Sequence, residues 1–336
     1  MTEPRDSRRD APEDDGEGRS SRIRRLAPAK LAGSTAAALL ALGLAWVVSS
    51  TIVRTMTDWV DARPEHRLAF AEIELVPRPP LWIRTGAAGI LHSVRVESRR
   101  EEHVSIPGLD LEEFRKDFRR CPWVEDVPGV VRSYGRLAVR LVYRKPVAVA
   151  AYDGELVLVI DKDGVILPPD DIDWIEKGTR FRIRGIDEPL MTIRDVPRPA
   201  STVPGLPWKR ADTPEALGDR DPMVVGAARL AAFFQGRPRV TPAGKAAPAF
   251  VAIWPDPESR RYFLKDGGDH WVFWDSAPGA EPLGGPTAVE KWSMLLDWID
   301  RHGPLTVGAP AYLRFERSGA EIFPGRRAAR GPGGTR

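Results

Sequence analysis

The sequence has little cysteine: Cys121 is the single thiol in 336 residues. An intramolecular disulfide and a thiolate metal cluster are therefore excluded, and stability has to come from packing. The five histidines, at positions 66, 92, 103, 270 and 302, offer no pair with the i, i+4 spacing that brings two imidazoles to one metal ion. The sequence thus predicts no metal site and no cofactor.

The chain also lacks the short motifs of common catalytic sites, namely G-x-S-x-G, the P-loop and G-x-G-x-x-G. The DKDG turn that begins at Asp161 is similar to the start of a calcium loop. Val165 occupies the third ligand position, however, and no glutamate stands at the twelfth. Asp170, Asp171 and Asp173 follow two prolines, and we interpret them as a solvated loop rather than a catalytic pair. No catalytic residue is predicted, and the chain is expected not to be an enzyme.

An excess of one charge sign is missing as well. Lysine and arginine total 50 against 47 acidic residues, and a formal charge of +3 is too small to indicate nucleic acid binding. No nucleic acid and no small-molecule substrate is therefore expected. The 32 prolines and 30 glycines predict many loops and strand ends and few long helices.

Residues 1–30 carry many charges and few large apolar side chains, which predicts a disordered tail. Residues 31–53 carry no charge, and 23 helical residues would cross the ~30 Å hydrocarbon core of a bilayer. The basic end of the tail predicts a cytoplasmic N-terminus and extracytoplasmic domains behind one transmembrane helix in the cytoplasmic membrane. A cleaved signal peptide is the alternative. Residues 54–67 then form a juxtamembrane stalk.

Alternation and capping patterns predict the folded part. Asp110 begins a helix with Glu113 in a capping box, and Cys121 falls on its apolar face, where an inert thiol is the simpler interpretation and a reactive one stays open. Residues 136–144 alternate between arginines and apolar side chains, and this pattern predicts a strand with one buried face. Thr287 begins a second capped helix, and a final hairpin spans residues 312–323. The tryptophans at strand spacing, Trp254 among them, are interpreted as core.

The predicted fold class is α+β: the transmembrane helix, a small domain over residues 68–147 and a larger, mostly antiparallel β domain with flanking helices over residues 148–323. Residues 195–222 hold six prolines and read as a linker or insertion within the β domain. Residues 324–336 form a disordered basic tail.

Three segments of residues 121–168, PWVEDV, LAVRLVYRKPVA and LVIDKDGVILP, resemble the FtsQ/DivIB family of bacterial cell-division proteins. The signature residues, which we take to be structural, are Pro122, Trp123, Val124, Arg144, Pro146, Asp161 and Gly164. The likeness continues more weakly in Leu283-Gly284, the helix after Glu290 and the segment YLRFERSG. In that segment Tyr312 replaces the usual aspartate and Phe315 the usual tyrosine.

The resemblance implies a POTRA domain, with elements in the order β-α-α-β-β, followed by the β domain. It also implies a non-enzymatic scaffold of the division machinery that binds FtsB-like and FtsL-like proteins at the division site and helps to control septal peptidoglycan synthesis. We expect the partner to add a strand to the edge of the last hairpin. The residues expected to contact it are Tyr312, Leu313, Arg314, Phe315 and Glu316. The alternatives are a POTRA-bearing envelope-assembly or secretion factor with a chaperone-like role and, least favoured, a periplasmic wall hydrolase.

Overall fold

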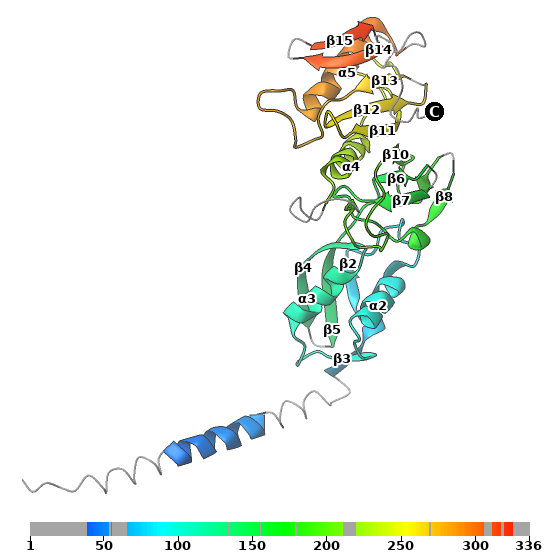
Figure 1. Ribbon diagram of the computed structural model, residues 1–336. Helices are drawn as coiled ribbons and strands as arrows, with labels where there is room; N and C mark the ends of the chain where they lie inside the picture. The colour runs from blue at the N-terminus through cyan, green and yellow to red at the C-terminus, as the bar shows by residue number, and fades with distance from the viewer. Residues whose placement is uncertain are drawn as a thin grey trace, which may run out of the picture. The chain divides into compact units, whose positions relative to one another are not determined.

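The computed structural model describes residues 39–53, 55 and 66–324, with gaps at 134, 155, 179, 211–219, 269, 306–310 and 317–318 (Figure 1). Between 311 and 324 the side chain of Phe315 alone is described. The predicted tails before residue 31 and after Pro324, and most of the predicted stalk, lie outside these residues. The chain divides into two compact units, Met1–Trp59 and Val60–Arg336, which are described separately.

The first unit contains an exposed apolar helix over residues 39–53. Among the residues that the structure describes, no helix combines the length and the apolar character needed to cross a membrane. The predicted fold class was therefore wrong in its transmembrane helix over residues 31–53. Within the described residues the physical reason is length, because helical residues 39–53 rise only about 22 Å, against a bilayer core of about 30 Å.

The second unit is α+β and begins with an N-terminal module, residues 66–147. Its elements are β1 (Arg67–Ala69), η2 (Phe70–Glu72), β2 (Glu74–Val76), α2 (Gly86–Glu97), β3 (His103–Ser105), α3 (Leu111–Arg120), β4 (Val124–Ser133) and β5 (Arg136–Tyr143). The main sheet has the order β2-β5-β4, with β2 parallel and β4 antiparallel to β5. The order β2-α2-α3-β4-β5 is the β-α-α-β-β order that the resemblance implied, and the antiparallel pair β1–β3 adds to it.

Helix α3 shows how the sequence positions this module. Asp110 caps the helix by accepting hydrogen bonds from Glu112 N (2.9 Å) and Glu113 N (3.2 Å). The Glu113 side chain does not complete the predicted capping box but lies 3.4 Å from the Arg100 guanidinium. The buried face of α3 carries Phe114 and Phe118, which pack on the ring of Phe70. The α3 helix is thereby fixed on the module's core.

Strand β5 follows its predicted alternation over most of its length. Leu137, Val139 and Leu141 are buried, and Arg136 and Arg140 are exposed. The arginine that follows the strand, Arg144, departs from this pattern because its side chain is only 16% exposed. It lies near the end of the N-terminal module.

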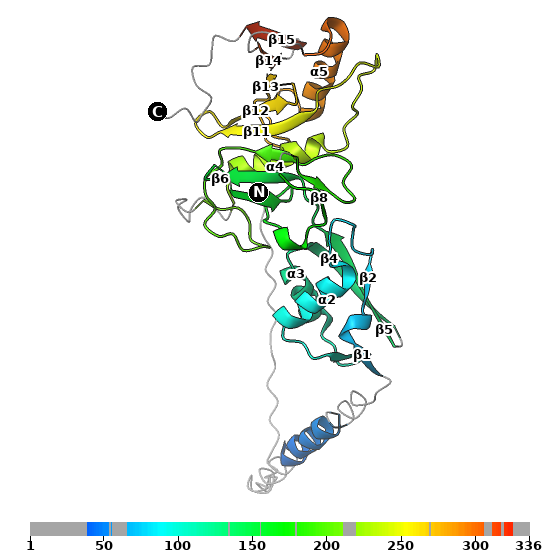
Figure 2. The same cartoon turned by 90° about the vertical axis from the view of Figure 1, so that its right-hand side faces the viewer.

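The C-terminal module, residues 148–324, contains one large sheet and several short elements. They are β6 (Ala148–Tyr152), β7 (Leu156–Ile160), η3 (Pro169–Asp171), β8 (Trp174–Glu176), β9 (Arg182–Ile183), β10 (Met191–Ile193), α4 (Pro222–Phe234), β11 (Phe250–Asp256), β12 (Arg261–Asp266), β13 (Trp271–Phe273), α5 (Ala288–His302), β14 (Ala311–Glu316) and β15 (Gly319–Pro324). The large sheet has the order β15-β14-β13-β12-β11-β10-β6-β7. Figure 2 shows β11 to β15 following one another across it.

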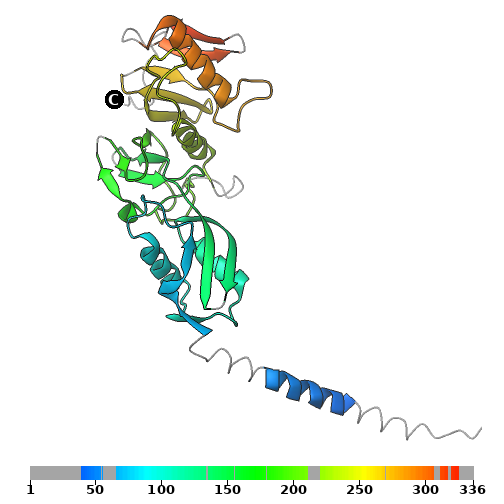
Figure 3. The same cartoon turned by 180° about the vertical axis from the view of Figure 1, so that it is seen from behind.

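Among the described strands this sheet is mixed, with four antiparallel and three parallel pairings. The parallel ones join β10 to both β6 and β11, and β14 to β13. Parallel neighbours need a crossover connection, and α4 and α5 lie in two of these connections. Figure 3 shows α5 crossing the strands of the sheet. Buried side chains of both helices join those of the strands in one core, including Leu230, Leu264, Trp274 and Leu295.

The proline-rich stretch 195–222 was predicted to be a linker or an insertion, and its described part is packed on the module. Trp208 is fully buried and its ring lies 5.7 Å from that of Tyr152. The Trp208 indole donates to the Pro197 carbonyl oxygen (3.2 Å), and its backbone N–H donates to Gly164 (2.7 Å). The described part of this segment therefore packs against the core without regular secondary structure and is not a flexible linker.

Candidate partner-binding edge and signature residues

The large sheet ends at the hairpin that the sequence singled out. Strand β14 pairs antiparallel with β15 from Ala311↔Pro324 to Glu316↔Gly319, and on its other side it pairs with β13 at Val272↔Leu313. The predicted contact residues, Tyr312 to Glu316, therefore belong to an inner strand, and β15 is the outermost one (Figure 1). A strand that extends the sheet at this end would pair with β15.

Phe315 belongs to the side of β14 that faces the core. Its ring centroid lies 5.2 Å from that of Trp274, and the side chain packs against the core beneath α5. Of the five predicted contact residues, this one serves to hold the hairpin on the module.

A second feature near this end is the sheet face opposite the helices. On β12, Tyr262 and Leu264 are buried, whereas the alternate residues Arg261, Phe263 and Lys265 lie on the other face and are not buried. Neighbouring strands add half-buried aromatic side chains to this face, and the complete aromatic set is Trp254, Phe263, Trp271 and Phe273. We call it the aromatic face.

The aromatic face was missed by the sequence analysis, which interpreted the strand tryptophans as core. Trp274 is fully buried, but Trp254 and Trp271 are only half-buried, and their rings pack at 4.5 Å. Lys265 stands over the ring of Trp271 at 5.6 Å. The alternation of charged and aromatic residues in RYFLK was the available signal, because a buried face does not carry lysine at strand spacing.

The signature residue Trp123 lies at the junction of the two modules. Its side chain is 3% exposed, and its indole N–H donates to Asp171 Oδ2 at 2.8 Å. Asp171 also accepts from the backbone N–H (2.9 Å) and the hydroxyl (3.0 Å) of Thr85. The interpretation of the acidic run as a solvated loop was therefore wrong for Asp171, whose carboxylate ties the C-terminal module to α2 and to the entry of β4.

Arg144 and Asp161 form a second tie across the junction. Arg144 Nη1 donates to Asp161 Oδ2 at 2.6 Å, and the aspartate side chain is only 2% exposed. The other carboxylate oxygen, Oδ1, accepts from Asp163 N (2.9 Å) and Val165 N (2.8 Å). Gly164 completes the turn with φ of +73°, a conformation that favours glycine. The DKDG motif is thus a turn held by its first aspartate.

The remaining signature residues are also placed by packing. Val124 is 1% exposed, and the Pro146 carbonyl accepts from Gln235 Nε2 at 3.1 Å. Pro122 lies so close to Gly205 that a Cβ there would come within 3.3 Å of the proline ring. All seven signature residues therefore lie at or near the module junction.

Buried side chains of both modules form one continuous core at this junction. Leu141 and Phe118 of the N-terminal module belong to the same cluster as Val149, Val159 and Ile172 of the C-terminal module. The two modules are therefore joined by packing as well as by polar ties.

Cys121 is buried beside this junction and is 2% exposed. Burial raises the pKa of its thiol to about 11, and the nearby carboxylates of Glu97 and Asp171 act in the same direction. The thiol is protonated at neutral pH, which agrees with the inert interpretation.

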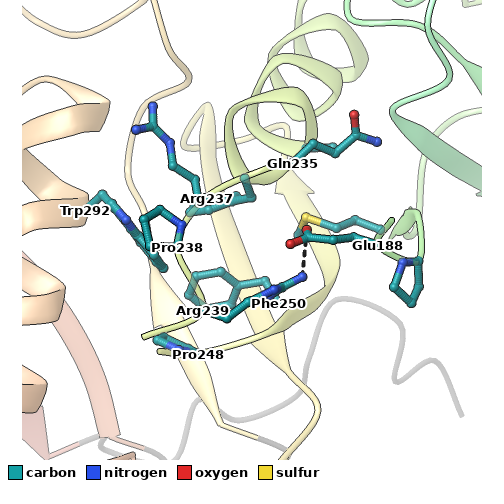
Figure 4. A pocket seen from close by; sticks show the side chains of 12 residues that line it. Glu188, Gln235, Arg237, Pro238, Arg239, Pro248, Phe250 and Trp292 are labelled. Carbon is teal, nitrogen blue, oxygen red and sulfur yellow. Dashed lines mark ion pairs between the residues drawn. The ribbon is translucent and has the colours of Figure 1, made fainter. Parts of the chain in front are cut away.

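Figure 4 shows a pocket between α4, α5 and the start of β11, where an ion pair of 2.6 Å joins Glu188 and Arg239. Phe250 and Trp292 belong to its wall. Its enclosed space is about 20 Å³, which is the room that one water molecule needs. In the part of the chain that the structure describes, no three His, Cys, Asp or Glu side chains are grouped so that they could hold a metal ion.

No model of a protein family matches the chain. No curated protein matches it either.

Proposed function

We propose that this protein is a non-enzymatic scaffold of bacterial cell division that binds FtsB-like and FtsL-like proteins and so helps to control septal peptidoglycan synthesis. The observation that carries the proposal is the sheet edge at β15, which among the described strands has a neighbour on one side only. The resemblance of residues 121–168 to the FtsQ/DivIB family supports it, as does the β-α-α-β-β order of the N-terminal module.

An outermost strand offers backbone N–H and C=O groups for a further strand, so the main chain supplies the affinity and side-chain contacts the selectivity. The aromatic face supports the same use, because Trp271 and Phe273 lie on β13, next to the hairpin in the sheet. Aromatic side chains contribute most to binding energy at protein interfaces. A partner segment that extends beyond its added strand would contact this face.

The junction supports a scaffold role in a second way. Because the modules share a core and two polar ties, the N-terminal module and the β15 edge are parts of one body. A partner bound at β15 would then be held in a fixed place relative to whatever binds the N-terminal module.

Proline in β15 tests the pairing. Adjacent strand residues direct their N–H groups to opposite sides, so of Glu321→Pro and Ile322→Pro one removes an outward N–H and the other an N–H bonded to β14. The variant that removes the outward N–H should no longer pull down an FtsB-like partner, while its urea midpoint stays near that of the parent. The other variant serves as the matched control for fold damage. Equal binding by both variants would place the partner edge elsewhere.

Location tests the cellular role separately. We expect the folded modules to act outside the cytoplasm at the division site, and a fluorescent fusion should form a mid-cell band. A uniform peripheral signal would instead favour the envelope-assembly alternative.

A further inference from the structure

The short hairpin β8–β9 carries a surface that the proposed function does not use. Trp174 pairs with Ile183 across the hairpin, and the Trp174 and Phe181 rings pack at 6.0 Å on its inner side. Ile183 is fully buried, so this side anchors the hairpin in the junction core. Ile175, on the opposite side, is 58% exposed.

The hairpin that carries Ile175 also carries cations. Arg182 and Arg184 alternate with buried Ile183 on β9 and are exposed, and the exposed Arg180 precedes them at the same spacing. Lys177 follows β8, and its ammonium lies 5.6 Å from the centre of the Trp174 ring. The hairpin therefore carries four cationic residues within positions 177–184 in addition to the exposed Ile175.

Two of these arginines are not used by the fold. Arg184 pairs with Asp173 at 3.2 Å, but within the described residues Arg180 and Arg182 form no ion pair. The neighbouring Glu176 is the register partner of Arg182, but within the described residues the two side chains form no ion pair. Guanidinium groups match carboxylates in a two-pronged geometry, so two unpaired arginines on one strand form a recognition surface for acidic side chains.

An open hollow lies beside the hairpin. It measures about 360 Å³, and its lining includes Trp174, the cations Lys177 and Arg84 and the carboxylates Asp170 and Asp173. Asp173 is already paired with Arg184. The hollow is open, and a side chain from a bound segment fits there against the half-buried face of Trp174.

We propose that the outer face of β8–β9 binds an acidic segment of a partner protein, with its carboxylates on Arg180 and Arg182 and an apolar residue on Ile175. A protein segment is favoured over nucleic acid because the cations are confined to one hairpin in a chain of net charge +3. It is favoured over a lipid surface because the hairpin exposes a single large aliphatic side chain. The proposal is independent of the division role and of β15.

Fluorescence anisotropy of the full chain with a short labelled peptide, in which glutamate and valine alternate, tests the site. Binding should saturate and should weaken as salt is raised, because the contacts are exposed ion pairs. The double variant Arg180→Gln/Arg182→Gln should weaken binding about tenfold, which corresponds to about 1.4 kcal/mol. Ile175→Ser should weaken it severalfold without changing its dependence on salt.

Arg136→Gln/Arg140→Gln is the matched control, because it removes the same charge from two exposed arginines of β5. Its affinity should equal that of the parent. Equal weakening by the control, or equal binding of a peptide with glutamine in place of glutamate, would overturn the proposal. Vesicles of phosphatidylglycerol and phosphatidylcholine provide a second check. The proposal would also be overturned if the Arg180→Gln/Arg182→Gln variant bound these vesicles more weakly than the parent but bound the peptide equally well. Proline variants in β15 should leave peptide binding unchanged, which separates this site from the proposed partner edge.

Discussion

Replacing Arg144 with methionine should destabilise the protein strongly, although the residue lies outside every regular element. The change leaves the Asp161 carboxylate, 2% exposed, without its cation. Removing one partner of a buried ion pair costs about 3–5 kcal/mol, because the remaining charge stays desolvated. Asp161 keeps its two backbone donors, Asp163 N and Val165 N, so we expect a loss near the lower end, about 3 kcal/mol.

The assay is urea unfolding followed by tryptophan fluorescence, with the slope of free energy against urea checked against that of the parent. Arg140→Met is the matched control, since Arg140 is exposed on the preceding strand and should change stability by no more than about 0.5 kcal/mol. Asp161→Asn keeps an oxygen for the turn but loses the charge. A double-mutant cycle over Arg144→Met and Asp161→Asn should give a coupling energy of about 2 kcal/mol.

Two results would refute this reasoning. A loss below about 1 kcal/mol in Arg144→Met would mean that solvent already screens the pair. Additive effects in the double variant, within about 0.5 kcal/mol, would mean that each residue acts through other contacts.

Two further predictions concern packing. Cys121 should resist a thiol reagent at pH 8, because burial raises its pKa to about 11, and labelling should become fast above the urea midpoint; fast labelling of the folded protein would contradict the buried position. Gly226→Ala should destabilise by about 1–3 kcal/mol despite the better helix propensity of alanine, because the new Cβ would lie only 1.9 Å from the Tyr262 hydroxyl oxygen. Urea unfolding measures the second effect, which should shrink when Tyr262→Phe removes that oxygen.

Local patterns predicted the elements whose cause is local. The α3 cap at Asp110, the capping box of Thr287 with Glu290 in α5, and the one-sided burial of β5 all follow from side chains a few positions apart. The short strands β8, β9 and β10 were missed, since two or three residues carry no periodicity and each is set by distant partners. The transmembrane helix over residues 31–53 was predicted from the length of the uncharged run alone.

Long-range contacts explain the errors about the site. Asp171 lies 48 residues from Trp123 in sequence, so nothing in its own loop showed that its carboxylate accepts a hydrogen bond from the Trp123 indole. The same holds for the last hairpin. The sequence predicts β14 and β15 as neighbours, but the parallel pairing of β14 with β13 spans α5 and is invisible to local reasoning. Without that pairing, the outer strand of the hairpin could not be told from the inner one.

The position of the β15 edge is therefore a property of the core rather than of the hairpin. The crossover through α5 brings β14 beside β13, and the contact of Phe315 with Trp274 holds it there. Trp274 is fully buried, and its carbonyl oxygen accepts from buried Lys291 of α5 at 3.0 Å. A change at Trp274 would then weaken partner binding by displacing β14 and the β15 edge. A change at Arg144, in the junction, would lower the stability of the folded protein but would leave the position of the β15 edge unchanged in the molecules that remain folded.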